Sequence, residues 1–295
     1  MKLFDKDFLR KLELLSIVAK KIMRGELVSQ RASVRKGASV EFLDHRIYSP
    51  GDDLRYLDWN VYGRLGSLFT KRFCSEENIT IKIFLDCSLS MDYGSNNKFD
   101  YARRLAAALG FIGVAHFDKV EIIPFSGGRR HTPFILFSKK QFPPMLEFLE
   151  GLSSTGVTSF RREFDLPPTP ERGKRVGFVI SDFLDTEGYK FTVTRLQALK
   201  VQLCGVHLLD ERELNPPDTG NLHLVDAEGK QVLSMAVSHS TLVRYRTALQ
   251  AFCREIEKYF LHKEAGYFRI KTLTPLQEVV LLTFRHAGLL SGSRL

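Results

Sequence analysis

Apolar and polar residues alternate from position 79 to 85, and the run ends abruptly in side chains that carry oxygen. The alternation and the β-branched residue types predict a buried β-strand. Asp86, Ser88 and Ser90 follow it within five residues. Because ligands bind beyond the carboxyl ends of strands in open parallel sheets, the pattern predicts a polar site at that edge.

The rest of the chain alternates between helical and strand-like patterns. Strands are expected at about 119–125, 132–137, 175–182, 201–209 and 267–271. Helices are expected between them at about 97–117, 139–152 and 240–261, together with one helix that ends at about 200 and one that follows Pro275. Such alternation predicts an α/β fold with a doubly wound, mostly parallel sheet over residues 78–290. Turn residues and short apolar runs at about 215–238 predict a small β-hairpin inserted into it.

The amino-terminal part shows a different pattern. Apolar residues recur at three- and four-residue steps from Phe4 to Ile22, which predicts a helix over about 4–24 that Gly25 ends. The acidic residues Asp5 and Asp7 argue against a membrane-surface helix, so we expect a docking helix. We expect residues 1–77 to form an extension packed on the main domain.

Composition narrows the class of protein. The chain has 295 residues, is 44% hydrophobic, and has no apolar stretch of the ~20 residues that a membrane span needs. Without an apolar leader at the start, we expect a cytoplasmic protein with no stable membrane insertion. Four scattered cysteines disfavour a zinc site or a disulfide framework. The net charge is +9, but the basic residues are spread along the chain and form no basic tail, so we expect no nucleic acid partner.

The Asp-x-Ser-x-Ser run at Asp86, Ser88 and Ser90 resembles the opening motif of the von Willebrand factor type A fold. In that fold the motif belongs to the metal-ion-dependent adhesion site (MIDAS). The resemblance implies a downstream threonine, for which Thr158 is the better match and Thr155 a rival, and an aspartate that ends a later strand, Asp182. Hard oxygen donors of this kind suit Mg²⁺ or Mn²⁺. The alternative is that Asp86 only caps the next helix.

A second resemblance lies upstream. The run Phe-Leu-Asp-His-Arg-x-Tyr-x-Pro-Gly-Asp-Asp-x-Arg-x-Leu-Asp-Trp from Phe42 to Trp59 is similar to the signature of the bacterial family called domain of unknown function 58. We expect a structural clasp in which ion pairs surround a buried Trp59, in preference to direct substrate contact. The residues expected to build it are Arg46, Tyr48, Gly51, Asp52, Arg55, Asp58, Trp59 and Arg64.

These observations favour a protein that binds other proteins without catalysis. A metal held by hydroxyls and carboxylates keeps an open position that attracts an acidic side chain of a partner. The family resemblance implies a MoxR-type AAA+ ATPase as partner, in protein assembly or maturation. Two alternatives stay open, a metal-free structural scaffold and a haloacid-dehalogenase-like phosphotransferase. The second needs an aspartate as general acid two residues after Asp86, where this chain has Ser88.

Overall fold

The structure is a computed structural model that describes residues 11, 15–17, 40–50, 53–75, 79–126, 129–130, 132–164, 173–185, 188–216, 220–225, 232–284 and 290–292. It divides into two compact units. One unit is Gly25–Asn78, and the other joins Met1–Arg24 to Ile79–Leu295. The division after residue 78 lies close to the predicted end of the extension at residue 77, but the first 24 residues group with the larger unit.

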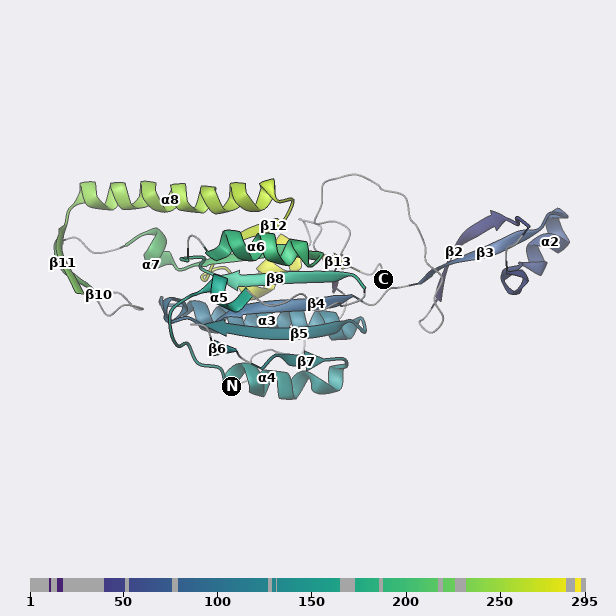
Figure 1. The fold of residues 1–295 in the computed structure, drawn as a ribbon, viewed down its shortest axis with the longest axis horizontal. Helices are drawn as coiled ribbons and strands as arrows, with labels where there is room; N and C mark the ends of the chain where they lie inside the picture. Colours follow the sequence, from purple (N-terminus) through teal and green to yellow (C-terminus); the bar gives the residue numbers. More distant parts are fainter. Residues whose placement is uncertain are drawn as a thin grey trace. The chain divides into compact units, whose positions relative to one another are not determined.

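The larger unit is built on one seven-stranded sheet (Figure 1). Its strand order is β12 (Gly266–Lys271), β9 (Val201–Leu209), β8 (Arg175–Ser181), β4 (Thr80–Asp86), β5 (Lys119–Ser126) and β6 (Arg129–Arg130), with β7 (Phe134–Leu136) also paired to β5. The first five strands are mutually parallel, whereas β6 and β7 run antiparallel to β5. The predicted mostly parallel sheet is therefore confirmed.

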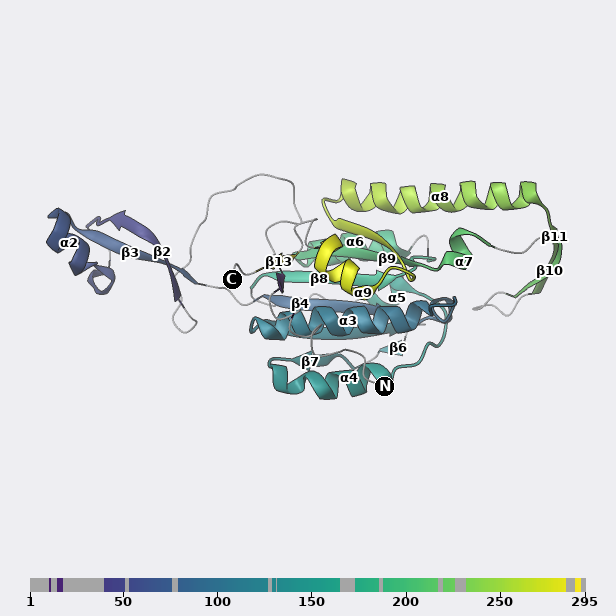
Figure 2. The ribbon, with the colours of Figure 1, turned by 180° about the vertical axis from the view of Figure 1, so that it is seen from behind.

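Helices cover both faces of this sheet (Figures 1 and 2). The β4 side chains of Ile81, Ile83 and Leu85 belong to a core with α3 (Lys98–Ala115), α4 (Phe142–Glu150), α9 (Leu276–Glu278) and the π-helical turn Val279–Thr283. Phe84 belongs to the opposite core, with α5 (Phe160–Phe164), α6 (Gly188–Ala198) and α8 (His239–His262). The period-2 pattern that predicted β4 thus divides its side chains between two buried cores, as a doubly wound sheet requires.

Helix α3 lies very close to the sheet at Gly113. A Cβ built at this position would be 2.6 Å from Ile81 Cδ1 and 2.6 Å from Val120 Cγ2. Because real side chains do not approach so closely, glycine is what allows the helix to pack on β4 and β5 there. Within the described residues, no helix is both long enough and apolar enough to cross a membrane.

The predicted hairpin insertion is confirmed by β10 (Gly220–Val225) and β11 (Val232–Val237), which pair antiparallel after the short helix α7 (Glu211–Leu214). The predicted amino-terminal helix is wrong at Leu15–Ile17. These residues form strand β1, which pairs with β13 (Leu290–Gly292). Long-range strand pairing overrides the local helical period there, and the rest of 4–24, apart from Lys11, lies outside the described residues.

The smaller unit is an antiparallel ribbon with a short helix. Strands β2 (Val40–Ile47) and β3 (Phe69–Ser75) pair with a register shift between Phe42 and Asp44. Between them lie a 3₁₀ turn at Leu54–Tyr56 and helix α2 (Trp59–Leu65). Gly66 ends α2 in the left-handed conformation, with a φ of 65° that glycine adopts without strain.

Candidate metal centre

The strand order places two aspartates at one point of the sheet. Strand β4 continues through α3 to β5 on one side, while β8 lies on its other side and continues through α6 to β9. Asp86 ends β4, and Asp182 directly follows β8. Ligands bind at such a topological switch point because the loops leave the sheet in opposite directions.

The Asp86 carboxylate is fully buried and accepts hydrogen bonds from Ser88 and Ser181. Its Oδ1 accepts the backbone N–H of Ser88 at 3.0 Å, and its Oδ2 accepts the hydroxyl of Ser181 at 2.6 Å. Burial and the nearby negative charge of Asp182 raise the pKa of Asp86 to about 7, although hydrogen bonds from Ser181 and from the backbone and side chain of Ser88 oppose the shift. The position therefore disfavours a second negative charge unless a cation is present.

The two motif serines lie together behind this carboxylate. Ser88 Oγ and Ser90 Oγ are 3.0 Å apart, and both side chains are buried. Ser88 precedes the 3₁₀ turn Leu89–Met91, but its side chain does not cap that turn. The hydrogen bond from the Ser88 N–H to Asp86 is a local turn contact, which the capping alternative also expects. The capping alternative does not explain why the Ser88 and Ser90 hydroxyls face each other.

The predicted threonine arrives on a loop that is hydrogen-bonded to the motif. Thr155 N–H donates to the Cys87 carbonyl at 2.7 Å, and Leu89 N–H donates to the Gly156 carbonyl at 3.0 Å. Thr155 itself is exposed, while Thr158 is buried. Between the two threonines left open by the sequence, Thr158 is the one whose side chain lies inside the protein.

Sequence reasoning missed a buried cation at this edge. Lys98, the first residue of α3, donates from Nζ to Asp182 Oδ2 at 2.8 Å and to Glu213 Oε1 at 2.7 Å. Burial alone would lower the pKa of Lys98, but the two carboxylates outweigh it and the pKa is raised, so the ammonium is charged. A signal was present, because Lys98 occupies the same helix face as the buried Ala102 and Leu105.

The donor set fits a small divalent cation. A carboxylate has about four lone-pair positions, so Asp86 can bind a cation beside its hydrogen bonds to Ser88 and Ser181, and the Ser88 and Ser90 hydroxyls are hard oxygen ligands. Across the described residues, no three His, Cys, Asp or Glu side chains cluster as metal ligands. A metal here would therefore depend on the hydroxyls as well as on the carboxylates, as the motif predicts.

Exposed apolar side chains lie next to the motif residues along the chain. Tyr93 is 44% exposed, Val157 is 49% exposed and Leu184 is 52% exposed. They come from three separate loops, following the serines, preceding Thr158 and following Asp182. We call these three residues the apolar rim. Exposed apolar groups beside polar ones are typical of surfaces that bind other proteins.

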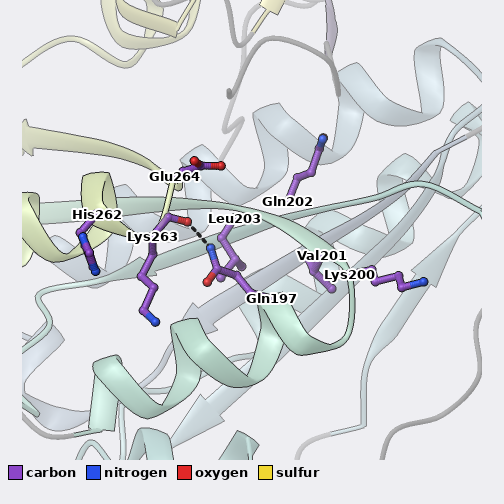
Figure 3. Close-up of a pocket in the computed structure, with 8 residues that line it drawn as sticks. All are labelled: Gln197, Lys200, Val201, Gln202, Leu203, His262, Lys263 and Glu264. Carbon is purple, nitrogen blue, oxygen red and sulfur yellow. Dashed lines mark hydrogen bonds between the residues drawn. The ribbon is translucent and has the colours of Figure 1, made fainter. Parts of the chain in front are cut away.

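Two cavities of the described residues lie away from the motif. One, of about 460 Å³, is at the opposite edge of the sheet, where β9 begins and α6 and α8 end (Figure 3). In it, Gln197 donates to the Lys263 carbonyl. Another, of about 560 Å³, lies between α8 and β12 and is lined by Arg254 and Arg269. Neither is lined by a motif residue, and the five motif side chains of the candidate centre are themselves buried.

The signature segment of the smaller unit is organised around Asp58. This buried carboxylate accepts the N–H groups of Asn60 and Val61 at the start of α2, and its Oδ2 lies 2.8 Å from His45 Nε2. Arg55 pairs with Asp53.

The expectation of a buried tryptophan is wrong, because Trp59 is 64% exposed and its ring contacts that of Tyr62. As the first residue of α2, its side chain projects from a helix too short to cover it. Arg46 and Arg64 are also exposed and Tyr48 is half-buried, while Gly51 and Asp52 lie outside the described residues.

Comparison with known proteins identifies the family. The family described as "Protein of unknown function DUF58" matches residues 44–255. The chain belongs to the DUF58 family. Uncharacterized proteins of Mycobacterium bovis and Mycobacterium tuberculosis are each 26% identical to this DUF58 protein over 238 residues, which are 77% of this chain and 73% of theirs.

Solved structures are also similar to the DUF58 chain. BatB from Bacteroides thetaiotaomicron, a conserved hypothetical protein, has a TM-score of 0.43 and 19% identity, over 72% of this chain and 99% of its own. An aerotolerance-related membrane protein from Bacteroides fragilis has a TM-score of 0.43 and 20% identity, over 71% of this chain and 100% of its own. The doubly wound, mostly parallel sheet that the sequence predicted is present in this DUF58 protein.

Proposed function

We propose that this DUF58 protein is a non-enzymatic binding module that holds Mg²⁺ or Mn²⁺ at Asp86, Ser88, Ser90, Thr158 and Asp182. The bound ion would present an open position to an acidic side chain of a partner protein. The observation that carries the proposal is the buried Asp86 carboxylate, placed beside the Ser88–Ser90 hydroxyl pair and the charge of Asp182. A small divalent cation is what reconciles those groups.

The surroundings of the site support a protein partner over a small molecule. The motif side chains are buried, but the loops that carry them expose the apolar rim of Tyr93, Val157 and Leu184, which offers contact area beside the site. The family resemblance adds the partner class. We propose a MoxR-type AAA+ ATPase, acting with this protein in the cytoplasm in the assembly or maturation of other proteins.

Metal titration tests the proposal directly. We expect calorimetry to show one Mn²⁺ bound per wild-type chain, and none bound by Asp86→Asn. Asp118→Asn is the matched control, because Asp118 is also buried but accepts the Ile79 N–H at the opposite edge of the sheet. That variant should bind Mn²⁺ like the wild type.

Capture of the ATPase from solution is the second measurement. We expect wild-type protein to retain it in Mg²⁺ and release it in chelator, and Asp86→Asn not to retain it. Equal retention by both proteins in chelator would favour the metal-free scaffold instead.

A further inference from the structure

Lys98 is not one of the proposed metal ligands, yet it is the most buried cation described at this edge. Its side chain has 0% exposure and bridges Asp182, after β8, to Glu213, in α7. Placing an ammonium out of water is costly unless carboxylates pair with it. The two short bonds to Asp182 and Glu213 meet that requirement without any metal.

We propose that Lys98 is a resident counter-ion of the metal centre, which competes with the divalent ion for Asp182 and keeps the affinity of the free protein for that ion low. This inference rests on the proposed function. It assigns to Lys98 a regulatory role at the same site.

The competition follows from how Asp182 is engaged. Its Oδ2 accepts Lys98, and its Oδ1 accepts the Leu184 N–H at 3.3 Å. Asp182 is therefore already neutralised before a metal arrives, and the ammonium repels any second cation placed beside the same carboxylate. Glu213 gives Lys98 a second partner, so Lys98 can remain charged and buried while Asp182 turns to a metal.

The net charge of the three carboxylates and Lys98 explains how the lysine helps the loaded site bind an acidic partner. When all three carboxylates are ionised, Asp86, Asp182 and Glu213 with Lys98 sum to −2, which a divalent ion would bring to zero. Without Lys98 the loaded centre would keep a negative charge and repel a partner carboxylate. The lysine thus lowers metal affinity but leaves the loaded site able to accept an acid.

Titration of the full chain with Mn²⁺ tests the role of Lys98. We expect Lys98→Met to bind Mn²⁺ at least about tenfold more tightly than the wild type, within the usual range of coupling between two sites. Lys98→Arg keeps the charge and should bind like the wild type. Lys82→Met is the matched control, because Lys82 is also a largely buried lysine paired with a carboxylate, Glu121, and its variant should leave Mn²⁺ affinity unchanged.

Thermal melts separate this role from a purely structural one. A resident counter-ion predicts that Lys98→Met loses stability in chelator and regains part of it in Mn²⁺, because the metal replaces the missing charge. A structural role predicts the same loss in both conditions. If Lys98→Met does not fold, Glu213→Gln tests the same inference. This variant leaves Lys98 with Asp182 as its remaining carboxylate partner of the two, so Lys98 should compete more strongly with Mn²⁺ and binding should weaken several-fold.

Three outcomes are informative. Tighter binding by Lys98→Met, or weaker binding by Glu213→Gln, supports the inference. Unchanged affinity in both variants, with wild-type binding still abolished by Asp86→Asn, overturns it and leaves the proposed function standing. Absence of Mn²⁺ binding in the wild type and every variant overturns the proposed function, and this inference with it.

Discussion

At the scale of single residues, Asp58 and Trp59 are neighbours with opposite roles. Asp58 caps the start of α2 and contacts His45 on β2, so it joins the helix to the ribbon of the smaller unit. Trp59 meets the edge of the Tyr62 ring and is mostly in solvent. The free energy of unfolding should therefore depend on the carboxylate more than on the ring.

We predict that Asp58→Ala lowers the unfolding free energy of the smaller unit by about 1–2 kcal/mol, the usual cost of losing a helix cap. Trp59→Ala should cost less than about 1 kcal/mol, because little of the ring is buried. Trp59 is the single tryptophan of the chain, so its fluorescence follows unfolding of this unit in Asp58→Ala. Circular dichroism serves for Trp59→Ala. A larger loss in Trp59→Ala than in Asp58→Ala would contradict this assignment.

At the scale of elements, the contact of α3 with the sheet sets a limit on helix sequence. Alanine is intrinsically better than glycine in a helix by about 1 kcal/mol. At Gly113 this gain is outweighed, because the added methyl would collide with Ile81 and Val120. We predict that Gly113→Ala destabilises the protein by about 1–3 kcal/mol.

Gly63 provides the matched control for that prediction. It also lies within a helix, α2, but a Cβ there would meet nothing within 4 Å. Gly63→Ala should therefore leave stability unchanged or raise it by up to about 1 kcal/mol. Urea denaturation of both variants measures the difference, and a stabilising Gly113→Ala would show that α3 can move away from the sheet.

A second prediction at this scale concerns the pairing of β4 with β5. Glu121 lies between Lys82 at 3.0 Å and Lys119 at 2.5 Å. Burial alone would raise the pKa of Glu121, but the two lysines outweigh it and hold the pKa below its ordinary value of 4.5. A lowered pKa stabilises the fold above pH 4.5, and this contribution is lost as the pH falls through the lowered value.

We predict that Glu121→Gln lowers the unfolding free energy at pH 7 by about 1–3 kcal/mol, the usual worth of hydrogen bonds to a charged group. The gap between wild type and variant should close as the pH is brought below 4.5. Denaturation of both proteins from pH 7 to pH 3 provides the measurement. A constant gap across that range would mean that the charge of Glu121 is not responsible.

The elements themselves could be predicted from the sequence where their patterns are local. Strand β4 and helix α3 were predicted because apolar residues repeat within a few positions and end at clear turn residues. Strand β1 was not, because its partner β13 lies more than 270 residues away. Lys98 was missed for the same reason, since its two carboxylates come from distant parts of the chain.

At the scale of the whole molecule, the apolar rim should decide partner binding without affecting the metal. We predict that Leu184→Ser weakens capture of the AAA+ partner at least about tenfold, because exposed apolar anchors contribute strongly to interfaces. Mn²⁺ affinity should be unchanged. Leu261→Ser is the control, since Leu261 is also exposed, at 61%, but lies near the end of α8 at the other edge of the sheet. Equal loss in both variants would exclude a specific role for the rim.

The order of the motif residues along the chain was enough to predict which edge of the sheet carries them, because parallel strands bring their carboxyl ends together. The sequence could not show whether residues 1–77 pack on the main domain, and this stays a prediction. The exposure of Trp59 could not be predicted from the sequence either, since the burial of a side chain depends on which surfaces pack together in the fold. Patterns along a chain predict elements, whereas contacts between distant segments need the fold.

The position of β4 in the sheet has a consequence during synthesis. One edge of β4 pairs with β5, which follows soon after, but the other pairs with β8, where Thr80 meets Arg175. At translation rates of ~5–20 residues per second, that edge waits for about 5–20 s after it is made. An apolar strand with unpaired N–H and C=O groups is a template for association with other chains. Nascent chains of this protein should therefore depend on chaperones until β8 has left the ribosome.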